Sequence, residues 1–393
     1  MGFLAAIVGL AVLVMIHEAG HFFAARAVGM TPRKFYLGFG PPIVRRRKGL
    51  VEYGIGSLPL GGYVKIPGMN RPSPGDLQRF LDPEQKQRHG PELEALDAAV
   101  VREDWEDAQR IAAQLRPALG DVRGFQELEW SFAPDAYWRQ STWRRLVAIF
   151  AGPAVNLVFA IVLFTALFVV AMTRQTTVVG KVLPNTPAAT AGLHNGDRVV
   201  VVAGKHVTPK DMPEHIRATK GRPFTLTVVR HGKRVTIGPV RARMTDGAYR
   251  IGIAIEARTG PGESVPAASR DAARLTWQVT ADTVRGLAHL ATGRDTNHVS
   301  SSVGIVRFSA EAWREGLRQF LFTLGLISLA LALLNLVPIL PLDGGHILMA
   351  LVEKVRGRTF PQAVYIRYSV VGLTLFAVLM YFGLRNDLFG GGG

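Results

Sequence analysis

The sequence predicts a polytopic α-helical membrane protein of about four transmembrane helices, with a β-hairpin and an inserted α+β domain between the membrane segments. Three observations predict this fold class. The mean hydropathy is +0.18 although 19% of the 393 residues are charged. Several apolar stretches approach the roughly 20 residues that a helix needs to cross a bilayer. The chain also exceeds the usual ~100–200 residues per domain, so polar domains are expected between those stretches.

The candidate spans are four apolar segments, taken in order along the chain. They cover residues 3–28, 146–172, 320–342 and 370–384, of which the last is short. The first segment resembles a signal peptide at Ala25–Ala27. However, no basic residue precedes its apolar run, and His17, Glu18 and His21 interrupt that run, which favours an uncleaved helix.

The formal net charge is +16, and the basic residues near the ends of the spans set the orientation. They gather in residues 33–48, 139–145 and 354–367, which lie on one side of the membrane if there are four spans. By the positive-inside rule that side is the cytoplasm, so the loop 173–316 and both termini lie outside. No basic run is interleaved with aromatic residues, so no nucleic-acid partner is expected.

The first span carries an H-E-x-x-H motif, His17-Glu18-Ala19-Gly20-His21. Residues four apart lie on one face of a helix, so both imidazoles can bind one zinc ion. Glu18 is turned about 100° from His17, which suits a general base beside a zinc-activated water. Ionisable residues inside a membrane span mark function by default. The alternative is a polar cluster that bonds to neighbouring helices.

A third metal ligand is expected, because a catalytic zinc site has three protein ligands and one open position. The chain has no cysteine, so this ligand must be His, Asp or Glu. The candidate is Asp343, which follows a stretch where Pro338 and Pro341 break the helix. His346 is the competing ligand. The alternative for Asp343 is an interfacial charge that binds no metal.

Asn156 follows Gly152-Pro153 on the second span. Small residues let helices approach closely, and an Asn side chain can bond to a neighbouring helix. Packing and catalysis are equally good interpretations of this residue.

Residues 35–66 are rich in Gly and Pro, with short alternating apolar stretches around a basic turn. This pattern suits a β-hairpin that dips into the membrane interface, and an ordinary cytoplasmic loop is the alternative. An exposed strand edge near Gly61–Lys65 would hold an unwound substrate by β-addition.

These motifs together resemble the site-2 protease family of intramembrane zinc metalloproteases, in its bacterial PDZ-containing branch that cuts anti-sigma factors. The order and spacing of the motifs agree over nearly the whole chain. The stretches that carry the resemblance are His17–His21, Phe150–Asn156 (similar to G-P-x-x-N), Asn335–Gly345 (similar to N-x-x-P-x-x-x-x-D-G) and Pro59–Lys65 (similar to a membrane re-entrant β-hairpin).

The resemblance implies one Zn²⁺ per chain, bound by His17, His21 and Asp343, with Glu18 as the catalytic base. It also implies that Asn335 positions the substrate or stabilises the oxyanion. The other candidates for substrate or oxyanion contacts are Asn156, Gly61, Gly62, Tyr63 and Val64.

Residues 174–258 indicate a compact β-rich domain. Its stretches Pro187–Ala189, Ala191–Leu193 and Gly196-Asp197 resemble a bacterial, circularly permuted PDZ domain. Such domains bind extended peptides or C-termini. The candidate peptide-binding residues are Ile251, Gly252 and Ile253, and a rigid spacer that binds nothing is the alternative.

The remaining boundaries follow from these segments. Residues 1–69 hold the first helix and the hairpin, 70–140 form a cytoplasmic helical insertion with amphipathic spacing, 141–173 are the second span, 259–316 are a linker with amphipathic helices, and 317–393 hold the third and fourth spans with the Asp-Gly ligand motif.

The predicted function is regulated intramembrane proteolysis in the bacterial inner membrane, with the PDZ-like domain outside the cytoplasm. The expected partners are the lipid bilayer and single-pass membrane proteins; the resemblance implies anti-sigma factors or remnant signal peptides. A membrane-anchored peptidase for soluble peptides is one alternative, but it needs a motif outside the apolar span. A scaffold with a vestigial metal site is another, but it does not need Glu18.

Overall fold

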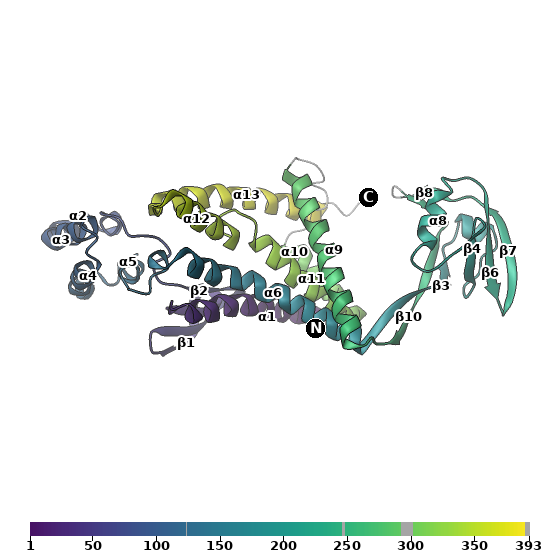
Figure 1. Ribbon diagram of the computed structural model, residues 1–393, viewed down its shortest axis with the longest axis horizontal. Helices are drawn as coiled ribbons and strands as arrows, with labels where there is room; N and C mark the ends of the chain where they lie inside the picture. Colours follow the sequence, from purple (N-terminus) through teal and green to yellow (C-terminus); the bar gives the residue numbers. More distant parts are fainter. Residues whose placement is uncertain (123, 246–247, 292–301, 390–393) are drawn as a thin grey trace. The chain divides into compact units, whose positions relative to one another are not determined.

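The structure is a computed structural model of the chain, and it describes all residues except 123, 246–247, 292–301 and 390–393. The chain forms two compact units (Figure 1). Unit 1 comprises Met1–Phe164 and Ser269–Gly393, and unit 2 comprises Thr165–Ala268.

Three helices are long and apolar enough to cross a membrane, among the residues that the structure describes. They are α1 (Gly2–Ala27), α6 (Thr142–Val170) and α11 (Leu317–Asn335). The fourth predicted span falls within α13 (Gln362–Phe389), whose apolar stretch Gln362–Val378 is shorter than the other three.

The third predicted span ends too late in the sequence. Helix α11 ends at Asn335 rather than at residue 342, and turns follow until α12 (Asp343–Arg356) begins. Pro338 and Pro341 lie in these turns, where proline cannot supply the backbone donor that a continuing helix needs. The chain therefore changes direction just before Asp343.

Helices α1 and α6 lie side by side at the level of the H-E-x-x-H motif (Figure 1). A Cβ atom on Gly20 of α1 would stand 2.7 Å from the Ala151 carbonyl oxygen of α6. Only glycine allows this approach, so the two backbones nearly touch beside the histidines.

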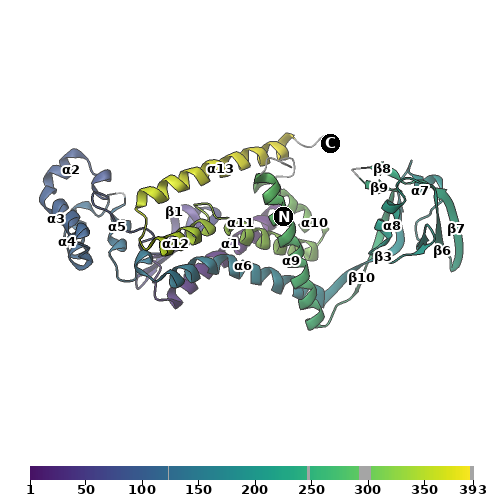
Figure 2. The ribbon, with the colours of Figure 1, turned by 45° about the horizontal axis from the view of Figure 1, so that its top comes forward.

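Helix α13 packs on α12 through Met349 and Tyr365 (Figure 2). Two further amphipathic helices complete unit 1: α9 (Val265–Ala291), which begins in unit 2, and α10 (Ser302–Glu315).

The predicted β-hairpin is formed by two antiparallel strands, β1 (Lys34–Lys48) and β2 (Val51–Lys65). Lys48 pairs with Val51 next to the turn, and the pairing continues to Pro42 with Gly56. Strand β2 then curves back, so that residues 62–65 pair with residues 34–37. The end of β2 thereby reaches the same level as the start of β1.

The polar segment after the hairpin is helical, as its amphipathic spacing predicted. It contains a 3-10 turn (Gln78–Phe80), α2 (Pro83–Arg88), α3 (Gly90–Val101), α4 (Trp105–Leu119), α5 (Phe125–Ser131) and a second 3-10 turn (Tyr137–Arg139). Leu93, Leu96, Ile111 and Leu115 are buried in its core, whereas Val101, at the end of α3, is exposed.

Unit 2 is built on one antiparallel sheet whose strand order differs from the order along the chain. Its elements are β3 (Ala171–Val182), α7 (Pro187–Thr190), β4 (Arg198–Val202), β5 (Lys205–His206), α8 (Met212–Ala218), β6 (Phe224–Arg230), β7 (Lys233–Val240), β8 (Arg243–Thr245), β9 (Ala248–Arg250) and β10 (Ile253–Pro261). The strand order is β10-β3-β4-β6-β7, with β5 paired to β4 and β8 paired to β9. Val179, Leu226 and Val228 are fully buried in the core.

Asp197 stabilises the turn before β4 in unit 2. Its carboxylate accepts hydrogen bonds from Arg230 Nε at 2.8 Å and from the His194 amide at 2.8 Å. Burial alone would raise the pKa of Asp197, but the bonds from Arg230 and His194 hold it below its usual value.

Candidate metal centre and active site

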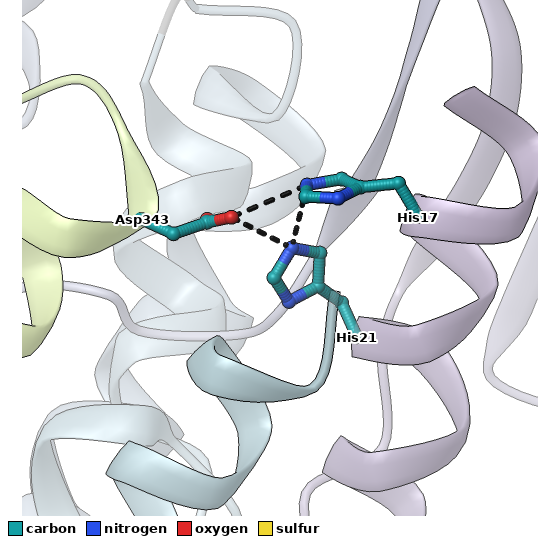
Figure 3. Close-up of side chains that lie close together, drawn as sticks. All are labelled: His17, His21 and Asp343. Atoms are coloured by element: carbon teal, nitrogen blue, oxygen red, sulfur yellow. Dashed lines mark hydrogen bonds and ion pairs between the residues drawn. The ribbon is translucent and has the colours of Figure 1, made fainter. Parts of the chain in front are cut away.

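His17, His21 and Asp343 meet inside unit 1 (Figure 3). The two histidines project from successive turns of α1, and Asp343 is the first residue of α12. His17 Nε2 lies 3.2 Å and His21 Nε2 3.3 Å from Asp343 Oδ2, and the two Nε2 atoms are 3.2 Å apart. Both histidines are buried, as few ionisable groups are without a partner or a metal.

These three atoms fit one zinc ion. With Zn–N and Zn–O bonds of about 2.0–2.1 Å, neighbouring ligand atoms of a tetrahedral site stand about 3.3–3.4 Å apart. The observed separations therefore form one triangular face of such a site, and its fourth corner remains for water or substrate. His346, the competing ligand of the sequence analysis, is not part of this cluster.

The outer nitrogen of His21 is held by helix α6. Its Nδ1 donates to the Ala148 carbonyl oxygen at 2.9 Å. With the proton fixed on Nδ1, the lone pair of Nε2 points toward the centre of the cluster.

Gly152 makes room for the same ring. A Cβ atom at this position would lie 2.3 Å from His21 Nε2. The sequence predicts only a helix-packing role for Gly152, because spacing along one helix does not show which side chain stands opposite it.

A pocket of about 740 Å³ opens onto the cluster. His17, Glu18, His21 and Asp343 all line it. The Glu18 side chain lies against strand β2, because a Cβ atom on Gly62 would stand 3.3 Å from Glu18 Cγ. Glu18 is thus held at the pocket wall, next to the two histidines but outside the set of converging ligand atoms.

Residues 5–379 match Peptidase family M50. The chain belongs to this peptidase family. It is 28% identical to "Zinc metalloprotease RasP" of Bacillus licheniformis over 410 residues, which cover 96% of each chain. It is 27% identical to "Probable protease eep" of Enterococcus faecalis over 422 residues, again 96% of each. The site-2 protease resemblance and the metalloprotease class predicted from the sequence are confirmed.

The pocket beside the metal cluster is also lined by several of the other predicted site residues. Asn335 lines it and donates through Nδ2 to the Leu331 carbonyl oxygen at 3.0 Å. Gly62, Tyr63 and Val64 line it too, whereas Gly61 does not. The structure thus brings Asn335 and the end of β2 to the metal cluster.

Four further predicted residues lie elsewhere. Asn156 on α6 is fully buried and outside the pocket lining. In unit 2, Ile251 is buried in the core, its carbonyl accepts from the Ala188 amide at 2.9 Å, and the Gly252 carbonyl accepts from the Leu183 amide at 3.0 Å. Ile253 begins β10.

The helical insertion forms a wall of the pocket, which its amphipathic spacing did not predict. The residues that it contributes include Asn70, Arg71, Asp76, Phe80, Glu127, Leu128 and Trp130. The Lys65 ammonium of β2 pairs with Glu127 and stands 6.0 Å from the centre of the Trp130 ring. These contacts join residues about sixty positions apart, so no local pattern could have revealed them.

Proposed function

We propose that this chain is an intramembrane zinc endopeptidase that cuts transmembrane segments of single-pass membrane proteins. The observation that carries the proposal is the position of the cluster: two of its three members and Glu18 belong to α1, a helix apolar and long enough to cross a bilayer. A peptidase for soluble peptides would need this motif outside such a helix.

The proposed metal site consists of His17, His21 and Asp343. Zn²⁺ held there would act as a Lewis acid and make water nucleophilic near neutral pH. Glu18 takes the proton from the attacking water at its carboxylate and returns it to the leaving amine, as a positioned general base and acid. Strand β2 packs against this side chain at Gly62.

Substrate binding by β-addition is supported by the direction of the β2 backbone. The Lys65 carbonyl accepts from the Arg33 amide at 2.7 Å and so points toward β1. Because successive residues of a strand point their backbone groups to opposite sides, those of Val64 and Gly62 point away from β1. An unwound substrate would pair with this edge, which lines the pocket. Asn335, which lines the same pocket, would contact the substrate or the oxyanion.

We further propose that unit 2 is a PDZ-like domain outside the cytoplasm, in a multi-pass protein of the bacterial inner membrane. Its antiparallel sheet and short helix α8 support this assignment. A peptide or a C-terminus would bind near Ile253 and Gly252. The hairpin β1–β2 would be the re-entrant element, and α13 the fourth span.

The test combines zinc analysis with cleavage of a single-pass substrate in detergent or vesicles. Glu18→Gln should retain zinc and lose roughly 10²–10⁴-fold in turnover, because it removes only the proton acceptor. His17→Ala should lose both zinc and activity. Cleavage by Glu18→Gln at the wild-type rate would reject the assignment.

A further inference from the structure

The two histidines differ in how their outer nitrogens are held. His21 Nδ1 has the Ala148 carbonyl as its acceptor. His17 Nδ1 is buried and has no hydrogen-bond partner among the described residues. A metal-ligating imidazole almost always donates this second N–H, which fixes its tautomer and orientation. The N–H at His17 Nδ1 therefore still needs a hydrogen-bond acceptor.

The packing of α1 against α6 shows which residue stands opposite His17. The helices run antiparallel, because His21 meets Ala148 while Leu13 shares a cluster with Phe159 and Leu163. His17 lies midway between His21 and Leu13, and so at the level of residues 155–156. Ala148, Gly152 and Asn156 are spaced by four, so they share one face of α6.

Asn156 is an unsatisfied polar group at this level. Its side chain is fully buried, and neither Oδ1 nor Nδ2 has a partner within the described part of the chain. Its backbone carbonyl accepts from Ser328 Oγ of α11 at 3.0 Å, which fixes its place between the helices. Burying an amide without hydrogen bonds is unfavourable, so a partner is expected.

We propose that Asn156 is the positioning residue of His17. Asn156 Oδ1 accepts the proton of His17 Nδ1 through one bridging water molecule, since the structure shows no direct bond between the two side chains. This bond directs the Nε2 lone pair toward the metal. Helix α6 then orients both histidines, His21 through a backbone carbonyl and His17 through a side-chain carbonyl. The inference rests on the proposed zinc site but assigns Asn156 no contact with substrate.

The test measures the zinc affinity of the purified full-length protein by competition with a chelator. Asn156→Leu has a similar volume but no acceptor, and should weaken zinc binding 10–100-fold. Asn156→Asp keeps an acceptor oxygen and should stay much closer to wild type. Thr323→Val on α11 is the matched control, because it also removes a fully buried, unpartnered polar atom from this helix bundle; its zinc affinity should not change.

A packing role for Asn156 predicts the opposite order. The apolar Leu variant would then bind zinc like wild type, and the Asp variant, with its buried charge, would be the weaker; this result would overturn the inference. If Asn156→Leu does not fold, Asn156→Ala takes its place with the same expectation. A wild-type protein that binds no zinc would instead overturn the proposed metal site itself.

Discussion

At the scale of single residues, the ring of His21 is confined by two residues of α6, Ala148 and Gly152. Ala148 holds its Nδ1, and Gly152 leaves the space in which Nε2 stands. Even one methyl group at position 152 would lie 2.3 Å from that nitrogen. Because a catalytic site requires each ligand in its correct geometry, this glycine matters as much as a ligand does.

Gly152→Ala should therefore displace the imidazole and weaken zinc binding by at least ~10-fold, with a matching loss of proteolysis. Chelator competition and a cleavage assay measure the two effects. Gly286→Ala is the control, because a Cβ atom on this helical glycine would meet nothing within 4 Å. Wild-type zinc affinity in Gly152→Ala would contradict the confinement of His21.

The three residues of the proposed metal site could be predicted from the sequence. Spacing by four puts His17 and His21 on one face of a helix. The prolines before Asp343 break the helix, which marks this carboxylate as a candidate ligand. What holds these ligands was not predictable. The roles of Ala148 and Gly152 depend on which helix packs against α1, and one helix's periodicity carries no information about its neighbour.

At the scale of elements, a buried ion pair joins α6 to α12. Arg145 Nη2 lies 2.5 Å from Glu353 Oε2, and both side chains are buried. Glu353 Oε1 also accepts from the Phe360 amide at 2.7 Å and from the Tyr365 hydroxyl at 3.1 Å. Arg145 is one turn from Ala148, and α12 begins with Asp343. The start of α6 therefore contacts His21 through Ala148, and through Arg145 it contacts the helix that begins with Asp343.

Glu353→Leu should destabilise the protein by roughly 3–5 kcal/mol, because it leaves the Arg145 charge buried without its partner. The double variant Arg145→Met with Glu353→Leu should recover most of that loss, since an apolar pair needs no desolvation of charge. Denaturation in detergent measures both. A double variant that is no more stable than Glu353→Leu would show that the charge pair is not the cause.

The end of β2 carries the prediction for substrate binding. Val64→Pro removes a backbone N–H that points away from β1, so an added substrate strand loses a hydrogen bond and KM should rise at unchanged zinc content. Val64→Ala, which keeps the N–H, is the control and should cleave nearly as well as wild type. A fall in kcat alone would mean that this amide serves Glu18 and not the substrate.

Elements with a local signal were predictable to different degrees. The alternating, Gly-rich stretch gave the hairpin, and amphipathic spacing gave the helices of the insertion. The end of α11 was misplaced because hydropathy continues through the proline turns after Asn335. The location of the insertion against the pocket depends on distant contacts, such as the ion pair of Arg33 with Asp135 at 2.7 Å, which hydropathy and periodicity do not encode.

At the scale of the whole molecule, the distribution of positive charge predicts which parts lie on opposite sides of the membrane. The insertion precedes α6 and unit 2 follows it, so a single crossing by α6 separates them. This separation does not depend on whether α13 is a fourth span. It requires only that α6 crosses the membrane, and the basic residues before α6 then predict that the insertion is on the cytoplasmic side.

Because the chain has no cysteine, single cysteines report this arrangement without background labelling. Lys205→Cys in unit 2 and Glu94→Cys in the insertion replace exposed residues. In intact cells with a permeable outer layer, a membrane-impermeant maleimide should label Lys205→Cys only. Glu94→Cys should react only after the inner membrane is opened, since the reagent cannot cross a bilayer. Equal labelling of both variants in intact cells would mean that α6 does not cross the membrane, and the proposed cleavage within the bilayer would lose its basis.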